Sequence, residues 1–353
     1  MNKKNKILEI AGKFEAEAVI ITDNSTRYWA TGFRSSAGIA IISTEEIALF
    51  LDGRYTEKAY SEKPDAVIYP CVNGISKTAS EYVGNKGICS LLIDENNITL
   101  GEFESLKSIF DKVKLIHTKS PYAELISQKD DREISLIKEA VKITDECFNH
   151  ILSMIKPGIY ESDISAEIDY YFRKRGCENA FETIVVSGVK SSMPHGTPEM
   201  VKLCENSFIT MDFGAKYKGY CSDLTRTVVL GKADDEQKFV YDTVLKANYK
   251  GIETAKCGVV CKDVDLAARD YISNKGFGEY FSHSTGHSLG IDIHESPSVS
   301  RLCESVLSNG NVITIEPGIY IPGKYGVRIE DTVLITDTET VVLSKSPKEL
   351  IEI

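Results

Sequence analysis

Short apolar runs alternate with amphipathic stretches over the first 127 residues. The runs that predict strands are residues 18–21, 38–42, 47–51, 66–69, 88–93 and 113–116. Between several of them, apolar side chains recur at helical spacing, which predicts helices over residues 75–83 and 100–109. Strands that alternate with helices are typical of a layered α/β domain, and we expect one over residues 1–127.

The pattern changes after the polar stretch 127–129, where we place the boundary of a second domain, residues 128–353. The elements expected there are helices over 130–156 and 162–174, strands over 183–186, 208–213 and 225–230, helices over about 234–256 and 263–274, and strands over 311–316 and 327–335. Two helices followed by a strand hairpin therefore occur twice. This repeat predicts a duplicated unit with a pseudo-twofold axis.

The two hairpins also match in their polar residues. Because side chains alternate between the faces of a strand, residues two apart share a face. The pairs that share a face are Thr210 with Asp212, Asp223 with Thr225, Thr314 with Glu316, and Glu330 with Thr332. Their neighbours Ile209, Met211, Ile313 and Ile315 are apolar, so the acids lie on strands that are expected to be buried.

Four buried carboxylates need positive partners, because an unpaired buried anion is prohibitively unfavourable. Arg226 and Arg328 are available, but two arginines cannot neutralise four carboxylates, and Asp331 adds a fifth acid nearby. A pair of divalent cations would neutralise the four. The alternative, a structural cluster of ion pairs, predicts that Asp223→Asn leaves activity intact.

Four of the six histidines, His195, His283, His287 and His294, occur in short polar motifs of the second domain. Three of them fall within twelve residues beside Gly286 and Gly290, which allow close approach of backbone and ligand. Oxygen ligands with one imidazole favour manganese, cobalt or iron-type ions, and zinc is an alternative.

Charge and composition exclude several classes of protein. The chain has 41 basic and 52 acidic residues and a formal net charge of −11, which disfavours nucleic acid as a partner. No apolar run approaches the roughly 20 residues that span a bilayer, so no membrane partner is expected. The nine scattered cysteines suit a reducing compartment, and we expect a soluble cytoplasmic protein.

Several ordered motifs carry a family resemblance. They are residues 187–196, 211–214, 219–227, 284–297, 314–320 and 326–331. In these motifs the chain resembles the pita-bread metallopeptidases, in the branch of Xaa-Pro aminopeptidase (aminopeptidase P) and Xaa-Pro dipeptidase (prolidase). Residues 24–33 and 52–55 resemble the creatinase-type N-terminal domain. The resemblance implies an α/β (α+β) fold, with a creatinase-type α/β domain followed by a pita-bread catalytic domain.

The resemblance also implies roles for individual residues. The metal ligands would be Asp212, Asp223, His287, Glu316 and Glu330, holding two divalent ions, Mn²⁺ in the first place and Co²⁺ or Zn²⁺ as alternatives. Asp223 and Glu330 would bridge the ions. His195 and His294 would flank the scissile carbonyl, and Glu316 would shuttle a proton to the leaving nitrogen.

Substrate binding would fall to His283, Arg328 and Tyr320, and the resemblance implies a homodimer. One departure is Ser288, where the family usually has glycine after the ligand histidine.

The predicted activity is hydrolysis of the bond between an N-terminal residue and a following proline in peptides. A dipeptidase of this family usually has an arginine after the His-Glu-x-Pro motif, but here Ser298 follows Pro297 and the nearest arginine is Arg301. We therefore prefer the aminopeptidase over the prolidase. A creatinase-like hydrolase or binding module without metal is disfavoured because all five ligands are present, and a methionine aminopeptidase because of the N-terminal domain.

Overall fold

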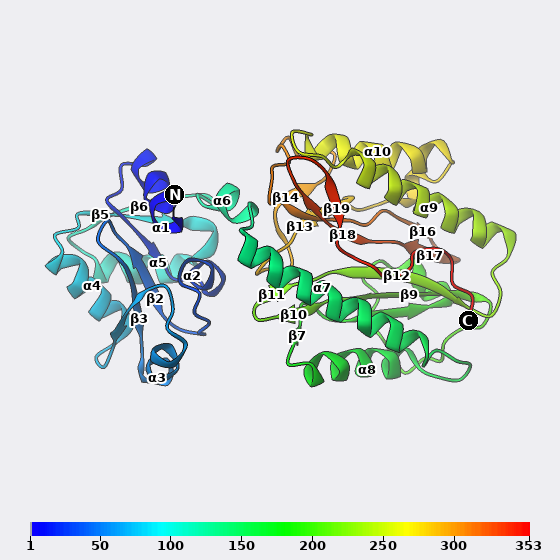
Figure 1. The fold of residues 1–353 in the computed structure, drawn as a ribbon, viewed down its shortest axis with the longest axis horizontal. Coiled ribbons are helices and arrows are strands. Elements are labelled where there is room, and N and C mark those ends of the chain that lie inside the picture. The colour runs from blue at the N-terminus through cyan, green and yellow to red at the C-terminus, as the bar shows by residue number, and fades with distance from the viewer. Residues whose placement is uncertain (1) are drawn as a thin grey trace. The chain divides into compact units, whose positions relative to one another are not determined.

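The computed structural model describes residues 2–353, which divide into two compact units. Unit 1 extends to Ile126 and unit 2 comprises Ser127–Ile353 (Figure 1). Each unit has its own buried apolar clusters.

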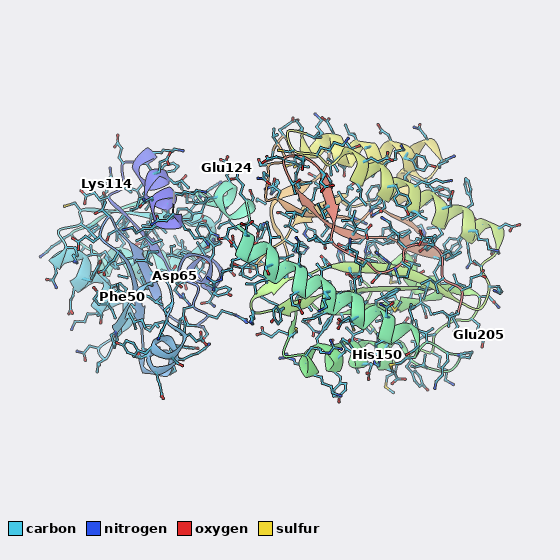
Figure 2. All side chains as sticks on the ribbon, in the orientation of Figure 1. Phe50, Asp65, Lys114, Glu124, His150 and Glu205 are labelled. Atoms are coloured by element: carbon cyan, nitrogen blue, oxygen red, sulfur yellow. The ribbon has the colours of Figure 1, made fainter. Side chains whose placement is uncertain are left out.

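Unit 1 is built on one mixed sheet with the strand order β4-β3-β2-β1-β5-β6. The strands are β1 (Ala18–Ile21), β2 (Ile39–Ile42), β3 (Ile47–Leu51), β4 (Val67–Pro70), β5 (Ser90–Asp94) and β6 (Lys114–Thr118). The helices are α1 (Lys3–Lys13), α2 (Asn24–Thr31), α3 (Gly53–Glu62), α4 (Ile75–Asn85), α5 (Leu100–Ile109) and α6 (Ala123–Ser127), whose last residue belongs to unit 2, with the short helix η1 (Glu95–Asn97). Phe50 of β3 is fully buried and stacks on Tyr69 at 5.0 Å between ring centroids (Figure 2).

Two pairs of helices enclose the strands of unit 2. The helices are α7 (Asp131–Leu152), α8 (Glu161–Lys174), α9 (Asp235–Thr254) and α10 (Cys261–Asn274), with the short helices η2 (Gly188–Ser192) and η3 (Gly278–Tyr280). Capping boxes begin α7 at Asp130 and α9 at Asp234, which satisfies free backbone N–H groups at equivalent places in the two halves. In Figure 1, α7 and α8 lie on one side of the strands and α9 and α10 on the other.

Two sheets of unit 2 contain the long hairpin strands of the two halves of the sequence repeat. The first has the order β12-β9-β8 and the second β14-β13-β15-β18-β19. Their strands are β8 (Ile184–Ser187), β9 (Ser207–Phe213), β12 (Leu224–Leu230), β13 (Gly286–Ser288), β14 (Glu295–Val299), β15 (Val312–Ile315), β18 (Asp331–Ile335) and β19 (Thr340–Val342). Smaller sheets contain β7 (Glu178–Asn179), β10 (Ala215–Tyr217), β11 (Tyr220–Cys221), β16 (Gly318–Ile321) and β17 (Tyr325–Arg328).

The single strand expected over residues 327–335 is wrong. The chain forms β17, which pairs with β16, and then β18, which pairs with β15 in another sheet. Ile329 and Glu330 lie between these strands, where the backbone changes from one partner to the next. Both strands are buried on both faces, so their apolar side chains form one run in which no change of sheet is visible.

Hydrogen bonds join the two halves close to the predicted acids. The Glu330 amide donates to the Thr225 carbonyl oxygen at 3.2 Å, and the Thr332 hydroxyl donates to the Asp223 carbonyl oxygen at 3.0 Å. The segments that carry Asp223 and Glu330 are thereby held side by side, although they are more than a hundred positions apart in the sequence.

Candidate metal centre

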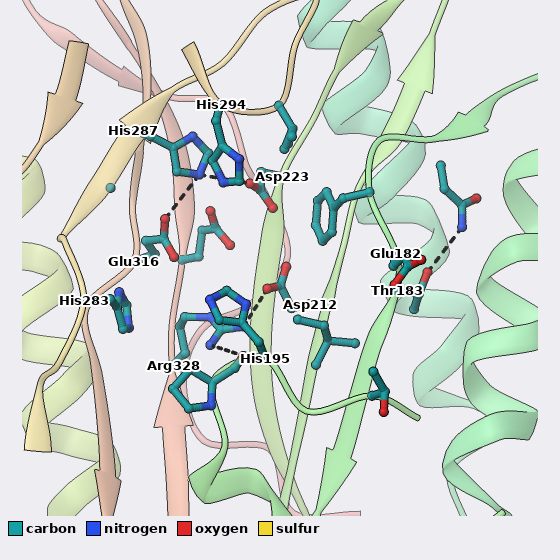
Figure 3. Close-up of a pocket in the computed structure, with 18 of the residues that line it drawn as sticks. Glu182, Thr183, His195, Asp212, Asp223, His283, His287, His294, Glu316 and Arg328 are labelled. Atoms are coloured by element: carbon teal, nitrogen blue, oxygen red, sulfur yellow. Dashed lines mark hydrogen bonds and ion pairs between the residues drawn. The ribbon is translucent and has the colours of Figure 1, made fainter. Parts of the chain in front are cut away.

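A pocket of about 1320 Å³ opens in unit 2 between the two halves of the repeat. Nine of the ten residues predicted for the site line it: His195, Asp212, Asp223, His283, His287, His294, Glu316, Arg328 and Glu330. The tenth, Tyr320, is buried and reaches His283 through its hydroxyl. Side chains that the sequence separates by up to 135 positions thus converge on one cavity (Figure 3).

Strand ends and turns present the acidic side chains to this pocket. Asp212 is on β9, and Asp223 precedes β12 in the same hairpin. Glu316 follows β15, and Glu330 precedes β18 in the second hairpin. The hydrogen bonds of the sheet fix the backbone of each strand up to its end. The side chains at the strand ends face the cavity, so a rigid support holds groups that are free to bind a ligand.

Asp223, His287 and Glu330 form the tightest group. One ligand atom from each of these residues lies within 4.8 Å of the others, which is the spacing of groups that share a cation. His287 Nε2 is 3.5 Å from a carboxylate oxygen of Asp223 and 3.4 Å from one of Glu316. Figure 3 shows Asp212 on the opposite side of these acids from His287.

The hydrogen bonds of His287 determine which nitrogen faces the acids. Its Nδ1 lies 3.1 Å from the Ser288 carbonyl oxygen, which can only accept, so Nδ1 carries the proton. In the neutral imidazole, Nε2 then directs a lone pair at carboxylate oxygens. Lone pairs that face each other repel. A cation placed between them would be coordinated by both, which removes the repulsion.

The positive side chains nearby are largely engaged elsewhere. Arg226 pairs with Asp331 at 2.8 Å, and Lys348 contacts the same carboxylate at 2.5 Å. Arg328 pairs with Asp212 at 2.5 Å. Within residues 2–353, no Lys or Arg forms an ion pair with Asp223, Glu316 or Glu330, so three neighbouring acids share one imidazole.

This arrangement strongly favours protonated carboxyls in the absence of a cation. Burial raises the pKa of Asp223 well above its ordinary value, and the charges of Asp212 and Glu316 raise it further. Burial and the charge of Asp223 likewise raise the pKa of Glu330, and burial raises that of Glu316. Oxygen Oδ1 of Asp212 and Oε1 of Glu330 are buried and have no hydrogen-bond partner in the described structure. Unpartnered buried oxygens beside a free imidazole lone pair fit a divalent cation.

Threonines fix the orientation of the acids. The Thr225 hydroxyl donates to Glu330 Oε2 at 2.8 Å, and the Thr314 hydroxyl donates to Glu316 Oε1 at 3.1 Å. Thr314 also accepts the His287 amide proton at 3.0 Å. These contacts hold one oxygen of each carboxylate, and Oε1 of Glu330 is left without a partner. In the sequence these threonines stand out only because they share a strand face with the acids.

A chain of hydrogen bonds runs along one wall, from Arg328 through Tyr320 to His283. Arg328 Nη1 donates to the Tyr320 oxygen at 2.8 Å, and the Tyr320 hydroxyl lies 2.9 Å from His283 Nε2. Since His283 Nδ1 donates to the Ser284 carbonyl oxygen, Nε2 is the acceptor for the Tyr320 proton. Burial and the charge of Arg328 lower the pKa of His283 to about 4, so its imidazole is neutral near pH 7.

His195 and His294 lie on either side of the acids. The ring of His294 is 4.4 Å from that of His287 between centroids, and burial, together with the charges of His287 and His195, lowers its pKa. His195 is exposed beside Asp212 (Figure 3), and Arg328 Nη1 holds its loop by donating to the Pro194 carbonyl oxygen at 3.2 Å. Both rings are therefore available to a molecule in the pocket.

One wall of the pocket was not predicted from the sequence. This wall carries Asp169, Arg173, Glu178 and Glu182 from α8 and the segment after it. Asp169 accepts a hydrogen bond from the Thr183 hydroxyl at 2.9 Å and so fixes this segment. Charged residues at the end of an amphipathic helix are also typical of a solvent-exposed face. The sequence therefore gives no signal that distinguishes residues lining a pocket from ordinary surface residues.

Cys221, His117 and His150 do not line the pocket, and each has a partner elsewhere in the structure. Burial raises the pKa of the Cys221 thiol to about 12, and its sulfur donates to the Ile291 carbonyl oxygen. His117 pairs with Glu95 at 2.6 Å, and His150, which is labelled in Figure 2, pairs with Glu167 at 2.7 Å.

Comparisons with known proteins show the family of this chain. Residues 135–337 match the model of metallopeptidase family M24, and residues 4–125 match the creatinase/prolidase N-terminal domain. The chain belongs to metallopeptidase family M24. The predicted family and fold class, a creatinase-type domain followed by a pita-bread domain, are therefore confirmed.

Three relatives illustrate the similarity. An Xaa-Pro dipeptidase of Pyrococcus horikoshii is 37% identical over 353 residues, which cover 99% of both chains. The structure of an Xaa-Pro dipeptidase from Bacillus anthracis matches with a TM-score of 0.95 and 38% identity over 100% of both chains. That of an X-Pro aminopeptidase from Thermotoga maritima matches with a TM-score of 0.92 and 33% identity over 98% of this chain and 100% of the other. No helix among residues 2–353 has the length and apolar character needed to cross a membrane.

Proposed function

We propose that this M24 peptidase is an Xaa-Pro dipeptidase, which hydrolyses the bond between an N-terminal residue and a C-terminal proline. The observation that carries the proposal is the similarity to Xaa-Pro dipeptidases over the whole chain, with a TM-score of 0.95 to one of them. The pocket retains the acids and histidines that the chemistry needs. This proposal replaces the preference for an aminopeptidase that the sequence motifs alone suggested.

Two divalent metal ions, Mn²⁺ in the first place, are the proposed cofactors. Asp212, Asp223, His287, Glu316 and Glu330 would hold them, with Asp223 and Glu330 shared. When bound, the ions supply Lewis acidity, which polarises the scissile carbonyl and lowers the pKa of a water molecule. The ligand set contains oxygen and a single imidazole nitrogen, which is the donor chemistry that manganese accepts.

The protein's own groups would complete the reaction. Glu316 takes a proton from the attacking water and passes it to the prolyl nitrogen as the C–N bond breaks. His195 and His294 donate hydrogen bonds to the carbonyl oxygen as negative charge develops on it. A bond that precedes proline has no N–H, so a site that acts through the carbonyl can cleave it without a strand-like hydrogen bond to that nitrogen.

An Xaa-Pro aminopeptidase is the second candidate, because one specific residue favours it. Ser298 occupies the position after Pro297, where the sequence analysis expects a dipeptidase to have an arginine for the free carboxylate. The Ser298 hydroxyl instead lies 3.2 Å from that of Ser300. A longer peptide has no carboxylate at this position and does not need that arginine.

The experiment compares Leu-Pro with Leu-Pro-Ala on the purified full chain, with Mn²⁺ added. We expect kcat/KM for Leu-Pro to exceed that for the tripeptide by about tenfold or more, a difference of roughly 1.4 kcal/mol in transition-state binding. Faster cleavage of the tripeptide would favour the aminopeptidase. Failure to cleave either peptide with Mn²⁺, Co²⁺ or Zn²⁺ would reject both candidates.

A further inference from the structure

Lys129 is buried in unit 2, although the sequence places it in a polar stretch at a domain boundary. Its side chain is only 2% exposed, and its Nζ pairs with Glu295 at 2.9 Å. Lys129 Nζ also lies 3.3 Å from the Ser288 hydroxyl. A lysine that is removed from water in this way must be held by its partners, so the contacts define its position closely.

The contacts of Lys129 fall at both ends of one short loop. Ser288 ends β13 directly after His287, and Glu295 begins β14 directly after His294. Ser288 and Glu295 are cross-strand partners at a β-bulge in this hairpin. The ammonium group therefore clamps the loop 289–294 at its base, between the histidine of the metal centre and the histidine that faces the substrate.

The carboxylate of Glu295, which pairs with Lys129, also contacts the loop 289–294 directly. Its Oε1 accepts the Asp292 amide proton at 3.1 Å. It also lies against Gly290, where a Cβ atom would come within 2.6 Å of the same oxygen. Because the carboxylate fills the inside of the turn, its position determines the path of the backbone that leads to His294.

The backbone at Lys129 is held by hydrogen bonds. The Lys129 amide donates to the Gly310 carbonyl oxygen at 2.9 Å, and the neighbouring Asn311 side chain donates to the Ser127 carbonyl oxygen at 3.0 Å. These contacts connect Lys129 to the turn that precedes β15, the strand that leads to Glu316.

We propose that Lys129, through its buried pair with Glu295, is a positioning residue that holds His294 in the geometry needed for peptide hydrolysis. The catalytic part of this inference rests on the proposed function. Lys129 does not line the pocket, so it acts through Glu295, Ser288 and the loop between them. His287 has further supports of its own, the Thr314 hydroxyl and the β13 ladder, so metal binding does not depend on Lys129.

The test is Lys129→Met in the full chain, which keeps most of the side-chain volume and removes the charge. We expect kcat for Leu-Pro to fall by roughly 10- to 100-fold, because a displacement of about 1 Å at a group that contacts the substrate has this effect. KM and metal content should change little. In the metal-free protein, amide hydrogen exchange in residues 289–294 should accelerate by about tenfold, while exchange in β9 and β12 stays unchanged.

A double variant separates positioning from a general loss of stability. Adding Glu295→Gln to Lys129→Met removes the uncompensated buried charge, and the amide oxygen can still accept the Asp292 proton. We therefore expect the double variant to recover most of the exchange protection and part of kcat relative to Lys129→Met. Lys232→Met is the matched control: it removes a lysine from an exposed pair with Glu352 and should leave both measurements unchanged.

Several outcomes would overturn the proposal. One is a Lys129→Met variant whose hydrogen exchange in residues 289–294 and whose kcat equal those of the wild type. Another is a double variant whose exchange protection and kcat are no higher than those of Lys129→Met. If Lys129→Met does not fold, Glu295→Gln alone keeps the side-chain size and must still accelerate exchange in residues 289–294. If the wild-type protein cleaves no Xaa-Pro peptide, the proposed function fails, whereas exchange in the metal-free variants still tests the clamp.

Discussion

Asp223 lies among three other acids, since the charges of Asp212 and Glu316 raise its pKa and its own charge raises the pKa of Glu330. Its carboxylate also faces the free lone pair of His287. A side chain in these surroundings is stabilised by a cation and by little else. The competing explanation from the sequence, a structural ion-pair cluster, requires a basic partner, and the ion pairs of the described residues provide it with none beyond His287.

Asp223→Asn tests this difference, because it preserves shape and removes one charge. We expect activity on Leu-Pro to fall by roughly 100-fold or more, together with loss of bound metal measured by atomic emission. Asp242→Asn, which changes an exposed acid paired with Lys246, serves as the control and should retain both. Full activity and metal content in Asp223→Asn would support the structural cluster.

His283 gives a prediction on pH. Its folded-state pKa of about 4 is below the ordinary value of 6.5, so folding favours the neutral imidazole. The stabilisation is complete above pH 6.5 and is lost as the pH falls toward 4. In His283→Gln this loss is absent, and we expect the Tm of the variant to depend less on pH across this window than that of the wild type. Parallel Tm curves, measured by calorimetry, would contradict this.

At the scale of residues, the sequence identifies which side chains are chemically unusual but not which of them pair. Acids at alternating positions on apolar strands predict buried charge, and the fold brings them together. The choice between Arg226 and Arg328 as partner for each acid depends on the arrangement of the two halves. Arg226 pairs with Asp331 and Arg328 with Asp212, and no spacing in the chain indicates this.

At the scale of elements, periodicity predicts most long helices and strands well because their buried faces are regular. Helix α7 begins and ends within a few residues of the predicted 130–156, since Asp130 caps it and Pro157 follows it closely. Strands β17 and β18 were predicted as one, because side chains buried on both sides lose the alternation that marks a strand. The burial of Lys129 was also missed, since a polar stretch before a helix normally indicates solvent.

The hairpin β13–β14 depends on close packing at Gly286. A Cβ atom there would lie 1.9 Å from the Thr314 carbonyl oxygen, which belongs to the neighbouring strand β15. Gly286→Ala should force the strands apart and reduce the free energy of unfolding by about 3 kcal/mol, with loss of activity because His287 is adjacent.

Gly84→Ala is a control for Gly286→Ala, since Gly84 lies in α4 with open space around it. This change should be neutral or stabilise the protein by up to about 1 kcal/mol. Denaturant unfolding followed by circular dichroism measures both variants. If Gly286→Ala and Gly84→Ala had equal free energies of unfolding, the backbone at Gly286 would be able to move at no cost in stability.

At the scale of the whole molecule, the formal charge of −11 and the charge of the metal centre have different consequences. Many acids are exposed, and those that make exposed ion pairs, such as Asp242 with Lys246, contribute little to stability. The buried acids of the pocket repel one another when they are ionised, and their raised pKa values mean that they avoid this repulsion only by taking up protons. The metal-free protein therefore carries a local destabilisation that its function requires, and bound cations should remove it.

Glu330→Gln should change the Tm in opposite directions without metal and with Mn²⁺. Without metal, the change removes one of the buried repelling charges while the amide oxygen can still accept the Thr225 proton, so the Tm of the variant should exceed that of the wild type. With Mn²⁺ at about 100 times its dissociation constant, the wild type gains about 2.7 kcal/mol by mass action, whereas the variant has lost a ligand and should gain far less. The order of the two Tm values is therefore expected to reverse when Mn²⁺ is added. A variant that is less stable than the wild type in both conditions would mean that Glu330 holds the fold together rather than a metal ion.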